Sequence, residues 1–365
     1  MLKQQKIFFD FLRFCIGSAK EIPGSLKEVD WKELYAIAKK QCLVGVLFDG
    51  IKKLPAEYVG MEKELLLQWM AESQMLEKAN VRLNDAVIQV SEWFRKKGFS
   101  TCILKGQGNA LMYPNPYSRT PGDIDIWVEG GDKRVISFVR SISPHEKACY
   151  HHIEFPSYKG VEVEVHYRPS FLLCFWHNRK LLKYYESVKD EQFSHRVMLG
   201  EQGEIAIPTV EFNLIFQLTH IFSHLMNEGI GLRQLLDYNY VLISDDLSLI
   251  RDRVQKELKE LGLWKFAGGI MYIMQEVFGM PASRLIVPPN EKYGKFVLNE
   301  VLEAGNFGKH DARNRFGRSQ LGHNLQRVYR DMRLVKFFPA EALCEPLFRS
   351  WHFFWRLKYN NQIIN

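Results

Sequence analysis

Residues 119–128, RTPGDIDIWV, place two aspartates, Asp123 and Asp125, one residue apart in an apolar run that follows a Pro-Gly pair. Proline and glycine interrupt regular structure, and the alternation after them is typical of a β-strand. Alternate side chains of a strand share a face, so both carboxylates point the same way, with α-carbons roughly 7 Å apart. Taken alone, the motif describes an exposed strand end more often than a metal site. The surrounding sequence must therefore show whether the two aspartates belong to an exposed strand end or to a metal site.

The composition is that of a folded protein with more than one core. The chain has 365 residues, of which 46% are hydrophobic and 25% charged. Its six cysteines show no CxxC spacing, so we expect them to be reduced and buried. We expect the N-terminal segment to form an amphipathic helix rather than a signal peptide, and no apolar run has the roughly 18 to 20 residues that a membrane span needs. These features predict a cytoplasmic protein.

Hydrophobic periodicity divides the chain into three regions. Helical spacing dominates up to residue 97 and is clearest over 62–97. Strand patterns and a helix then follow, and helical patterns return beyond Pro208, over 211–228, 232–243 and onward. We predict strands at 100–104, 123–128, 148–155 and 161–167 and a helix at 132–142. The expected fold is α+β, a small mixed-sheet domain at 98–200 between helical regions at 1–97 and 201–365.

Three further features accompany the two aspartates. In VEVEVH, residues 161–166, Glu162, Glu164 and His166 share one strand face, so a third carboxylate can reach the same metals. A strand running into a glycine turn at 103–108, ILKGQG, lets backbone amides approach a phosphate, and its lysine, Lys105, adds positive charge. Arg119 and Arg168 can meet a triphosphate. Each feature alone has an ordinary structural explanation, and it is their clustering that favours a site.

Together these motifs resemble a known family. The order LKG, YPNPYSRTPGDIDIWV and VEVHYRP is similar to the uncharacterised nucleotidyltransferases of bacteria, a branch of the polymerase-β-like nucleotidyltransferase superfamily. The resemblance is good over residues 98–170 and looser over 219–224 and 231–237, where the family has a histidine-bearing helix and then an Asp. It implies a nucleotidyltransferase fold for the central domain.

The resemblance also implies an activity and its residues. Asp123, Asp125 and Glu164 become the catalytic ligands of Mg²⁺ or Mn²⁺, with Glu164 preferred to Glu162 because the family acid stands two residues before the histidine. Lys105, Gly106, Gly108 and Arg119 become the groups that bind the nucleotide phosphates. The implied reaction moves a nucleotidyl group from a nucleoside triphosphate to a hydroxyl acceptor, more readily a small molecule than a nucleic acid. One departure is Gln107, where the superfamily often has Ser.

Other functions remain open from the sequence. A nucleotidyltransferase fold without activity would bind a nucleotide or a partner only. A nucleic-acid-binding protein would use the basic segment 309–336, which carries eight Lys and Arg against two Asp. A zinc hydrolase built from His151 or His152, His166 and the aspartates explains the DxD motif less well.

Two pairs of residues in the helical region receive structural interpretations. His220 and His224 share a helix face, and we expect a hydrogen-bonding role for them. We expect Asp237 to pair with Arg233.

Overall fold

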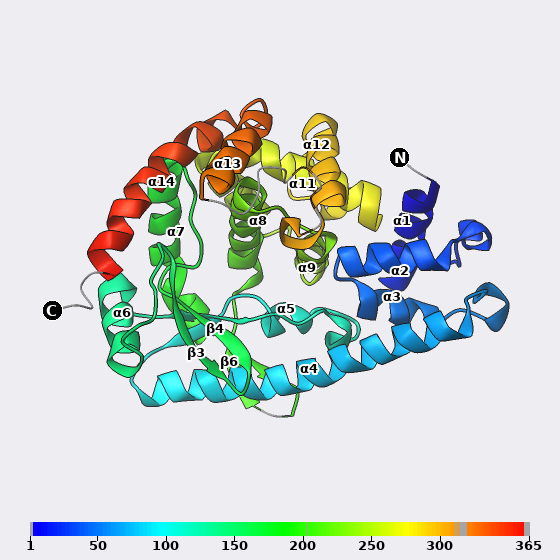
Figure 1. Cartoon of the computed structure of the whole chain (residues 1–365), viewed down its shortest axis with the longest axis horizontal. Helices are drawn as coiled ribbons and strands as arrows, with labels where there is room; N and C mark the ends of the chain where they lie inside the picture. Colours follow the sequence, from blue (N-terminus) through cyan, green and yellow to red (C-terminus); the bar gives the residue numbers. More distant parts are fainter. Residues whose placement is uncertain (1–2, 202, 310, 312, 314–319, 361–365) are drawn as a thin grey trace.

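The computed structural model describes residues 3–201, 203–309, 311, 313 and 320–360, and its helices surround a small sheet (Figure 1). The N-terminal region contains α1 (Lys3–Cys15), α2 (Trp31–Lys40), α3 (Val44–Ile51) and α4 (Lys63–Lys96). The central region contains α5 (Gln107–Ala110), α6 (Gly131–Ile142) and α7 (Phe175–Ser194). The C-terminal region contains α8 (Val210–Asn227), α9 (Leu232–Ile243), α10 (Arg251–Glu260), α11 (Trp264–Phe278), α12 (Glu291–Ala304), α13 (Gln320–Leu334) and α14 (Pro339–Asn360). Short 3₁₀ turns are η1 (Gly24–Glu28), η2 (Ala56–Tyr58), η3 (Pro116–Ser118), η4 (Ala282–Arg284) and η5 (Asn306–Gly308).

The main sheet is mixed and has the strand order β1-β2-β4-β3. Its strands are β1 (Thr101–Ile103), β2 (Ile124–Val128), β3 (His152–Tyr158) and β4 (Val161–His166). Strand β2 runs parallel to β4, while β1 pairs with β2 and β3 pairs with β4 in antiparallel fashion. A separate hairpin of β5 (Arg196–Leu199) and β6 (Gly203–Ala206) straddles residue 200, the expected end of the central domain. The α+β prediction with helical flanks is confirmed.

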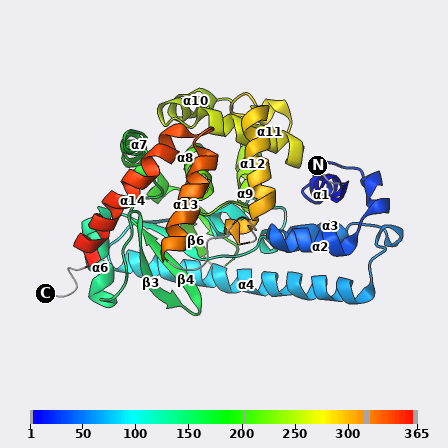
Figure 2. The same ribbon diagram turned by 45° about the horizontal axis from the view of Figure 1, so that its top comes forward.

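One long helix connects the two ends of the molecule. Helix α4 runs under both the strands and the N-terminal helices, and α8, α9, α13 and α14 lie across from the sheet in both ribbon views (Figures 1 and 2). The face of α4 that buries Leu83, Val87, Val90 and Phe94 packs on the sheet core with Ile124, Ile126 and Val165. These apolar residues of α4 recur at three- and four-residue spacing, which is what an amphipathic helix requires.

A second, larger core joins the two helical regions. It contains Phe11 of α1, Trp31 of α2, Leu218 of α8 and Phe266 of α11. The regions 1–97 and 201–365 therefore share one apolar interior, although they are far apart in sequence. Within the described part of the chain, none of the helices has both the length and the apolar character that crossing a bilayer demands.

Candidate active site

Three carboxylates meet where β2 and β4 run side by side. Asp125 of β2 and Glu164 of β4 are register partners, and Asp123 immediately precedes β2. One oxygen from each of Asp123, Asp125 and Glu164 lies within 4.8 Å of the other two. Glu162 is exposed and borders a neighbouring cavity instead. The strand pairing thus brings together the three acids that the sequence singled out and selects Glu164 over Glu162.

The carboxylates border a cavity of about 500 Å³ between the sheet and the C-terminal helices. Its wall includes Gly106 from the turn after β1, Gln217 of α8, Gln234 of α9 and Phe307 of η5. Five histidines also line it: His151, His152, His166, His220 and His224. A cavity of this size, with converging polar groups, is typical of a small-molecule site.

A lysine supplies positive charge at the carboxylates. The ammonium of Lys105 donates to Oδ1 of Asp125 at 2.8 Å and to Nε2 of His220 at 2.6 Å. Burial alone would lower the pKa of Lys105, but the charges of Asp125 and Asp123 outweigh it and raise that pKa. Burial, followed by the charge of Lys105, lowers the pKa of His220 well below its usual value, so this ring is neutral and accepts the hydrogen bond.

A second cation at the site is His166. Its Nε2 lies 3.0 Å from Oδ1 of Asp125 and 3.4 Å from Oε2 of Glu164. Burial opposes the charged ring, yet the hydrogen bonds to the two carboxylates raise the pKa of His166 to about 9. At neutral pH this histidine is an imidazolium that bridges two acids. Its place on β4, two residues after Glu164, follows from the alternation that the sequence shows.

The two aspartates differ in electrostatic environment. Burial would raise the pKa of Asp125, but Lys105 and His166 hold it well below its usual value. The negative charge of Asp125, followed by burial, raises the pKa of Asp123 to about 6. Repulsion of this kind is relieved by a cation, and three converging carboxylates provide the all-oxygen donors that Mg²⁺ and Mn²⁺ prefer. The residues present therefore fit a hard divalent ion.

The two glycines of the turn after β1, Gly106 and Gly108, have different roles. Gly106 lines the cavity and has φ +54°, a conformation that side-chain-bearing residues rarely adopt. Gly108 is buried, its N–H donates to the carbonyl of Lys105 at 3.1 Å, and an added Cβ would lie 3.0 Å from Ile207. Gln107 is buried and its amide contacts Asn84 of α4. Gly106 faces the site, whereas Gly108 and Gln107 pack the turn onto the protein.

Arg119, for which the resemblance implies a contact with phosphates, forms an ion pair with Asp237. Its Nε and Nη2 each donate to a carboxylate oxygen of Asp237 at 2.8 Å, and both side chains are buried. The prediction that Asp237 pairs with Arg233 is wrong, because the guanidinium of Arg233 instead donates to the carbonyl of Thr120 at 3.1 Å. Although Arg119 borders the cavity, its guanidinium is held by Asp237, so its expected contact with phosphates needs this pair to open.

A buried polar network around Asp237 was not visible in the sequence. Tyr113 donates to Oδ1 of Asp237 at 2.7 Å, and Asn109 donates to Oδ2 at 3.3 Å. Gln217 of α8 in turn donates to Asn109 at 3.1 Å. The only signal of these partners in the sequence is a polar residue inside an apolar helix pattern, and such a residue does not reveal what it contacts.

Arg168, the other arginine that the sequence placed near a triphosphate, lies in an ion pair with Asp132 at 2.9 Å.

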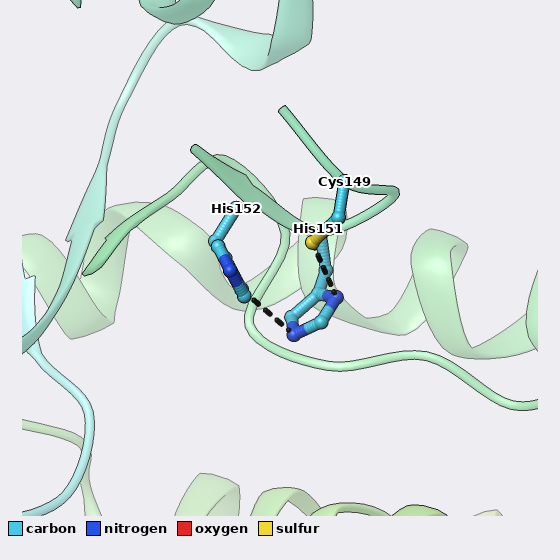
Figure 3. A group of neighbouring side chains, drawn as sticks. All are labelled: Cys149, His151 and His152. Carbon is cyan, nitrogen blue, oxygen red and sulfur yellow. Dashed lines mark hydrogen bonds between the residues drawn. The ribbon is translucent and has the colours of Figure 1, made fainter. Parts of the chain in front are cut away.

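Three residues with metal-binding side chains, Cys149, His151 and His152, also gather at the start of β3 (Figure 3). Sγ of Cys149 lies 3.6 Å from Nδ1 of His151, and Nε2 of His151 lies 3.1 Å from Nδ1 of His152. On a regular strand, two adjacent histidines would point to opposite faces, but β3 begins only at His152, and His151 lies in the bend before it. Burial lowers the pKa of His151 well below its usual value and that of His152 to about 4.

Two other histidines, His220 and His224, follow Lys105 along the cavity wall. Nε2 of His224 lies 3.2 Å from Nε2 of His220, and Nδ1 of His224 lies 3.3 Å from Oε2 of Glu228. Their spacing of four residues on α8 places them on one face, as predicted. Hydrogen bonding, the role expected for them, is what the structure shows.

Part of the basic segment 309–336 is engaged within the protein. Arg313 binds both oxygens of Glu300 and both oxygens of Asp311, and Arg333 lies 3.4 Å from Glu300. Arg330 is buried and donates to the carbonyl of Glu228 at 3.2 Å. The side chains of Lys309, Arg327 and Lys336 are exposed, whereas Arg315 and Arg318 lie outside the described residues. Within the described part of this segment, half of the basic residues are thus engaged internally.

Comparison with known proteins gives one family and one structure. A family model described as "Uncharacterised nucleotidyltransferase" matches residues 27–279, a span that includes Asp123, Asp125 and Glu164. The crystal structure of an antigenic nucleotidyltransferase-like protein from Paracoccidioides brasiliensis is similar, with 13% sequence identity and a TM-score of 0.31. The alignment covers 60% of this chain and 97% of that one. No curated protein matches the sequence.

Proposed function

The chain belongs to the family of uncharacterised nucleotidyltransferases, and we propose that it transfers a nucleotidyl group from a nucleoside triphosphate to a hydroxyl acceptor. The reaction would depend on Mg²⁺ or Mn²⁺ and release pyrophosphate. The observation that carries the proposal is the convergence of Asp123, Asp125 and Glu164, with oxygens within 4.8 Å of one another. A catalytically inactive copy of the fold has no need to keep three mutually repelling acids beside a cavity.

In the proposed reaction, the oxygen of the acceptor hydroxyl forms a bond to the α-phosphorus, and the bond between that phosphorus and the β-phosphate oxygen breaks. Bound divalent ions supply positive charge, which lowers the pKa of the hydroxyl and balances the charge of the triphosphate. Asp123, Asp125 and Glu164 hold those ions. The proton of the hydroxyl passes to a carboxylate oxygen of Glu164, whose side chain is one-third exposed toward the cavity.

The turn after β1 receives the phosphates in this proposal. Gly106 brings the backbone to the cavity surface next to Asp123, whose carbonyl oxygen would lie 3.6 Å from a Cβ at that position. Together with His166, Lys105 offsets the charge of Asp125 when no metal ion is bound. We expect the ammonium of Lys105 to turn from Asp125 to a phosphate oxygen when metal and nucleotide bind. The carboxylate and the phosphate are both anions, so either can accept the hydrogen bond of the ammonium.

A small acceptor fits the site better than a nucleic acid. The cavity of about 500 Å³ lies between the sheet and α8 and α9, a shape typical of sites for small ligands. Nucleic-acid binding generally requires several unpaired cations along a surface. In the basic segment, Arg313 and Arg333 are already paired with Glu300.

Thermal unfolding with each of the four common nucleoside triphosphates, with and without Mn²⁺, tests the proposal and identifies the donor. A ligand at a hundred times its dissociation constant should add about 2.7 kcal/mol to the stability of the native state. We expect metal-dependent stabilisation that the double variant Asp123→Asn, Asp125→Asn loses and that Glu162→Gln, on the same strand as Glu164, keeps. Equal stabilisation of the double variant would overturn the proposal.

A further inference from the structure

Cys149, His151 and His152 lie within four consecutive residues at the end of the sheet, beside the carboxylates but distinct from them. One donor atom from each of these three side chains lies within 4.8 Å of the other two. The sulfur and the two rings point toward one another (Figure 3). The function proposed above uses none of the three.

The backbone holds this segment in place from several sides. The N–H of Cys149 donates to the carbonyl of His152 at 2.9 Å, which closes the turn. The N–H groups of Tyr167 and Arg168 both donate to the carbonyl of His151, at 3.0 and 3.2 Å. The hydroxyl of Tyr167 donates to the carbonyl of Cys149. These bonds fix the segment before any ligand arrives, and such preorganisation favours metal binding.

We propose that Cys149, His151 and His152 form a second metal site, which takes a zinc-class divalent ion. Sulfur and imidazole donors favour zinc over Mg²⁺, which prefers oxygen. In a tetrahedral zinc site with such ligands, donor atoms lie roughly 3.3 to 3.6 Å apart. The sulfur lies 3.6 Å from one nitrogen of His151, and His152 lies 3.1 Å from the other, so each pair taken singly is close to this range.

Binding requires one local adjustment. Cys149 faces Nδ1 of His151 and His152 faces Nε2, whereas a single ion takes only one of these nitrogens. The widest donor separation, at most 4.8 Å, must therefore contract to roughly 3.5 Å. We expect rotation of the side chains to bring the donors together, because hydrogen bonds hold the backbone in place. The cysteine binds as a thiolate, so the thiol proton is released to solvent.

The cluster is accessible from two cavities. His151 and His152 line the cavity of the candidate active site, whereas Cys149 and His151 line a neighbouring cavity of about 380 Å³. Three protein donors leave a fourth position for water or a ligand oxygen. The ion would stand in the wall beside Glu164, whose Oε2 lies 3.4 Å from Nδ1 of His152. This site does not depend on the proposed nucleotidyl transfer.

Titration of the full-length, chelator-treated protein with Co²⁺ tests the site, because cobalt replaces zinc and a thiolate ligand gives an intense charge-transfer absorption. We expect this absorption to saturate at one equivalent of Co²⁺ and to disappear when Zn²⁺ is added. Cys149→Ser should abolish the absorption. His152→Asn, which keeps the thiol, should retain it and weaken cobalt binding at least tenfold. Absence of the absorption in the wild type, or its persistence in Cys149→Ser, would overturn the proposal.

Matched variants separate this site from others. Cys174 also lies in a group with metal-binding residue types, His177 and Glu341, so Cys174→Ser should leave the absorption unchanged if Cys149 is the ligand. Cys42→Ser controls for loss of a cysteine outside these groups. The double variant Asp123→Asn, Asp125→Asn should also keep the absorption, which makes this test independent of the nucleotidyl-transfer proposal. Circular dichroism of metal-free Cys149→Ser confirms that the variant is folded.

Discussion

Asp125 and Glu164 are register partners on two parallel strands, β2 and β4. Backbone hydrogen bonds between the strands, rather than loop conformation, therefore set the separation of their carboxylates. Sites built on strands hold their geometry more closely than sites built on loops. Asp123 stands one residue before β2, at the edge of this rigid frame. The sheet thus fixes two of the three acids, and the segment between Pro121 and β2 supplies the third.

Replacement of Lys105 by Gln should have opposite effects on the affinity for metal and on the affinity for nucleotide. Its ammonium competes with an incoming ion for Asp125, so its removal should tighten the binding of Mn²⁺ alone. The same change should weaken the binding of a triphosphate about tenfold or more, because a charge-assisted hydrogen bond contributes about 1.5 to 3 kcal/mol. Calorimetric titration with Mn²⁺ and then with nucleotide measures both. Changes in the same direction would contradict this role.

Replacement of His166 by Gln should weaken Mn²⁺ binding by about 10- to 100-fold, the usual cost of losing a group that orients metal ligands. The ring contacts both Asp125 and Glu164 and holds them together. We expect the loss of this positioning to outweigh the removal of the positive charge of the ring, which alone would favour metal binding as in Lys105→Gln. Because His166 acts through the acids, nucleotide binding without metal should change little in this variant. His195→Gln is a control, since His195 bonds to the carbonyl of Ile207, away from the cavity wall.

Metal binding should depend on pH through Asp123. The pKa of this carboxyl is raised to about 6, so a proton competes with the metal below that pH. We expect Mn²⁺ affinity to fall about tenfold for each pH unit below 6 and to be nearly constant from pH 7 to 8. Titrations between pH 5 and 8 measure this. An affinity that stays constant down to pH 5 would show that Asp123 is not a ligand.

The same raised pKa has a consequence for stability without metal. Because folding raises the pKa of Asp123, the stability that its protonated form contributes is lost as the pH rises through about 6. Asp123→Asn removes the repulsion with Asp125. The metal-free variant should therefore unfold at a higher temperature than the metal-free wild type at pH 8, and the difference should shrink at pH 5.

Loss of Asp237 should destabilise the fold strongly. Asp237→Asn leaves the guanidinium of Arg119 buried with a neutral partner, and breaking a buried ion pair costs about 3 to 5 kcal/mol. Glu211→Gln, which breaks the exposed pair with Arg253, should cost less than about 1 kcal/mol. Chemical denaturation of both variants provides the comparison. Similar losses of stability in the two variants would show that the Arg119–Asp237 pair does not stabilise the fold more than an exposed pair does.

Local patterns predicted the parts of the fold in which one face of an element is apolar. The alternation in β2 and β4 and the helical spacing in α4 predicted their type and nearly their bounds. Helix α7 was not predicted, because its sequence is largely polar and it buries only Asn178, Leu181, Tyr185 and Gln192. The β5–β6 hairpin is too short to stand out beside it.

Contacts between residues that are far apart in the sequence were the part of the site that was hardest to predict. The alternation around Glu164 and His166 predicted their shared face, but it did not reveal that Lys105 contacts His220 of α8. Arg233, four residues before Asp237 on α9, is the obvious helical partner, yet Arg119 reaches that carboxylate from a loop. A bend before β3 brings Cys149, His151 and His152 together, whereas a regular strand would place the two adjacent histidines on opposite faces. Such contacts depend on tertiary packing rather than on local pattern.

The central claim is that Asp123, Asp125 and Glu164 hold the divalent ion of a nucleotidyltransferase. Electron paramagnetic resonance of free Mn²⁺ during titration of the metal-free protein tests it most directly, in the presence of the triphosphate that stabilises the fold. The account predicts saturable binding that falls at least tenfold in Asp125→Asn and in Glu164→Gln and is unchanged in Glu162→Gln. Binding that is equal in all four proteins would contradict it.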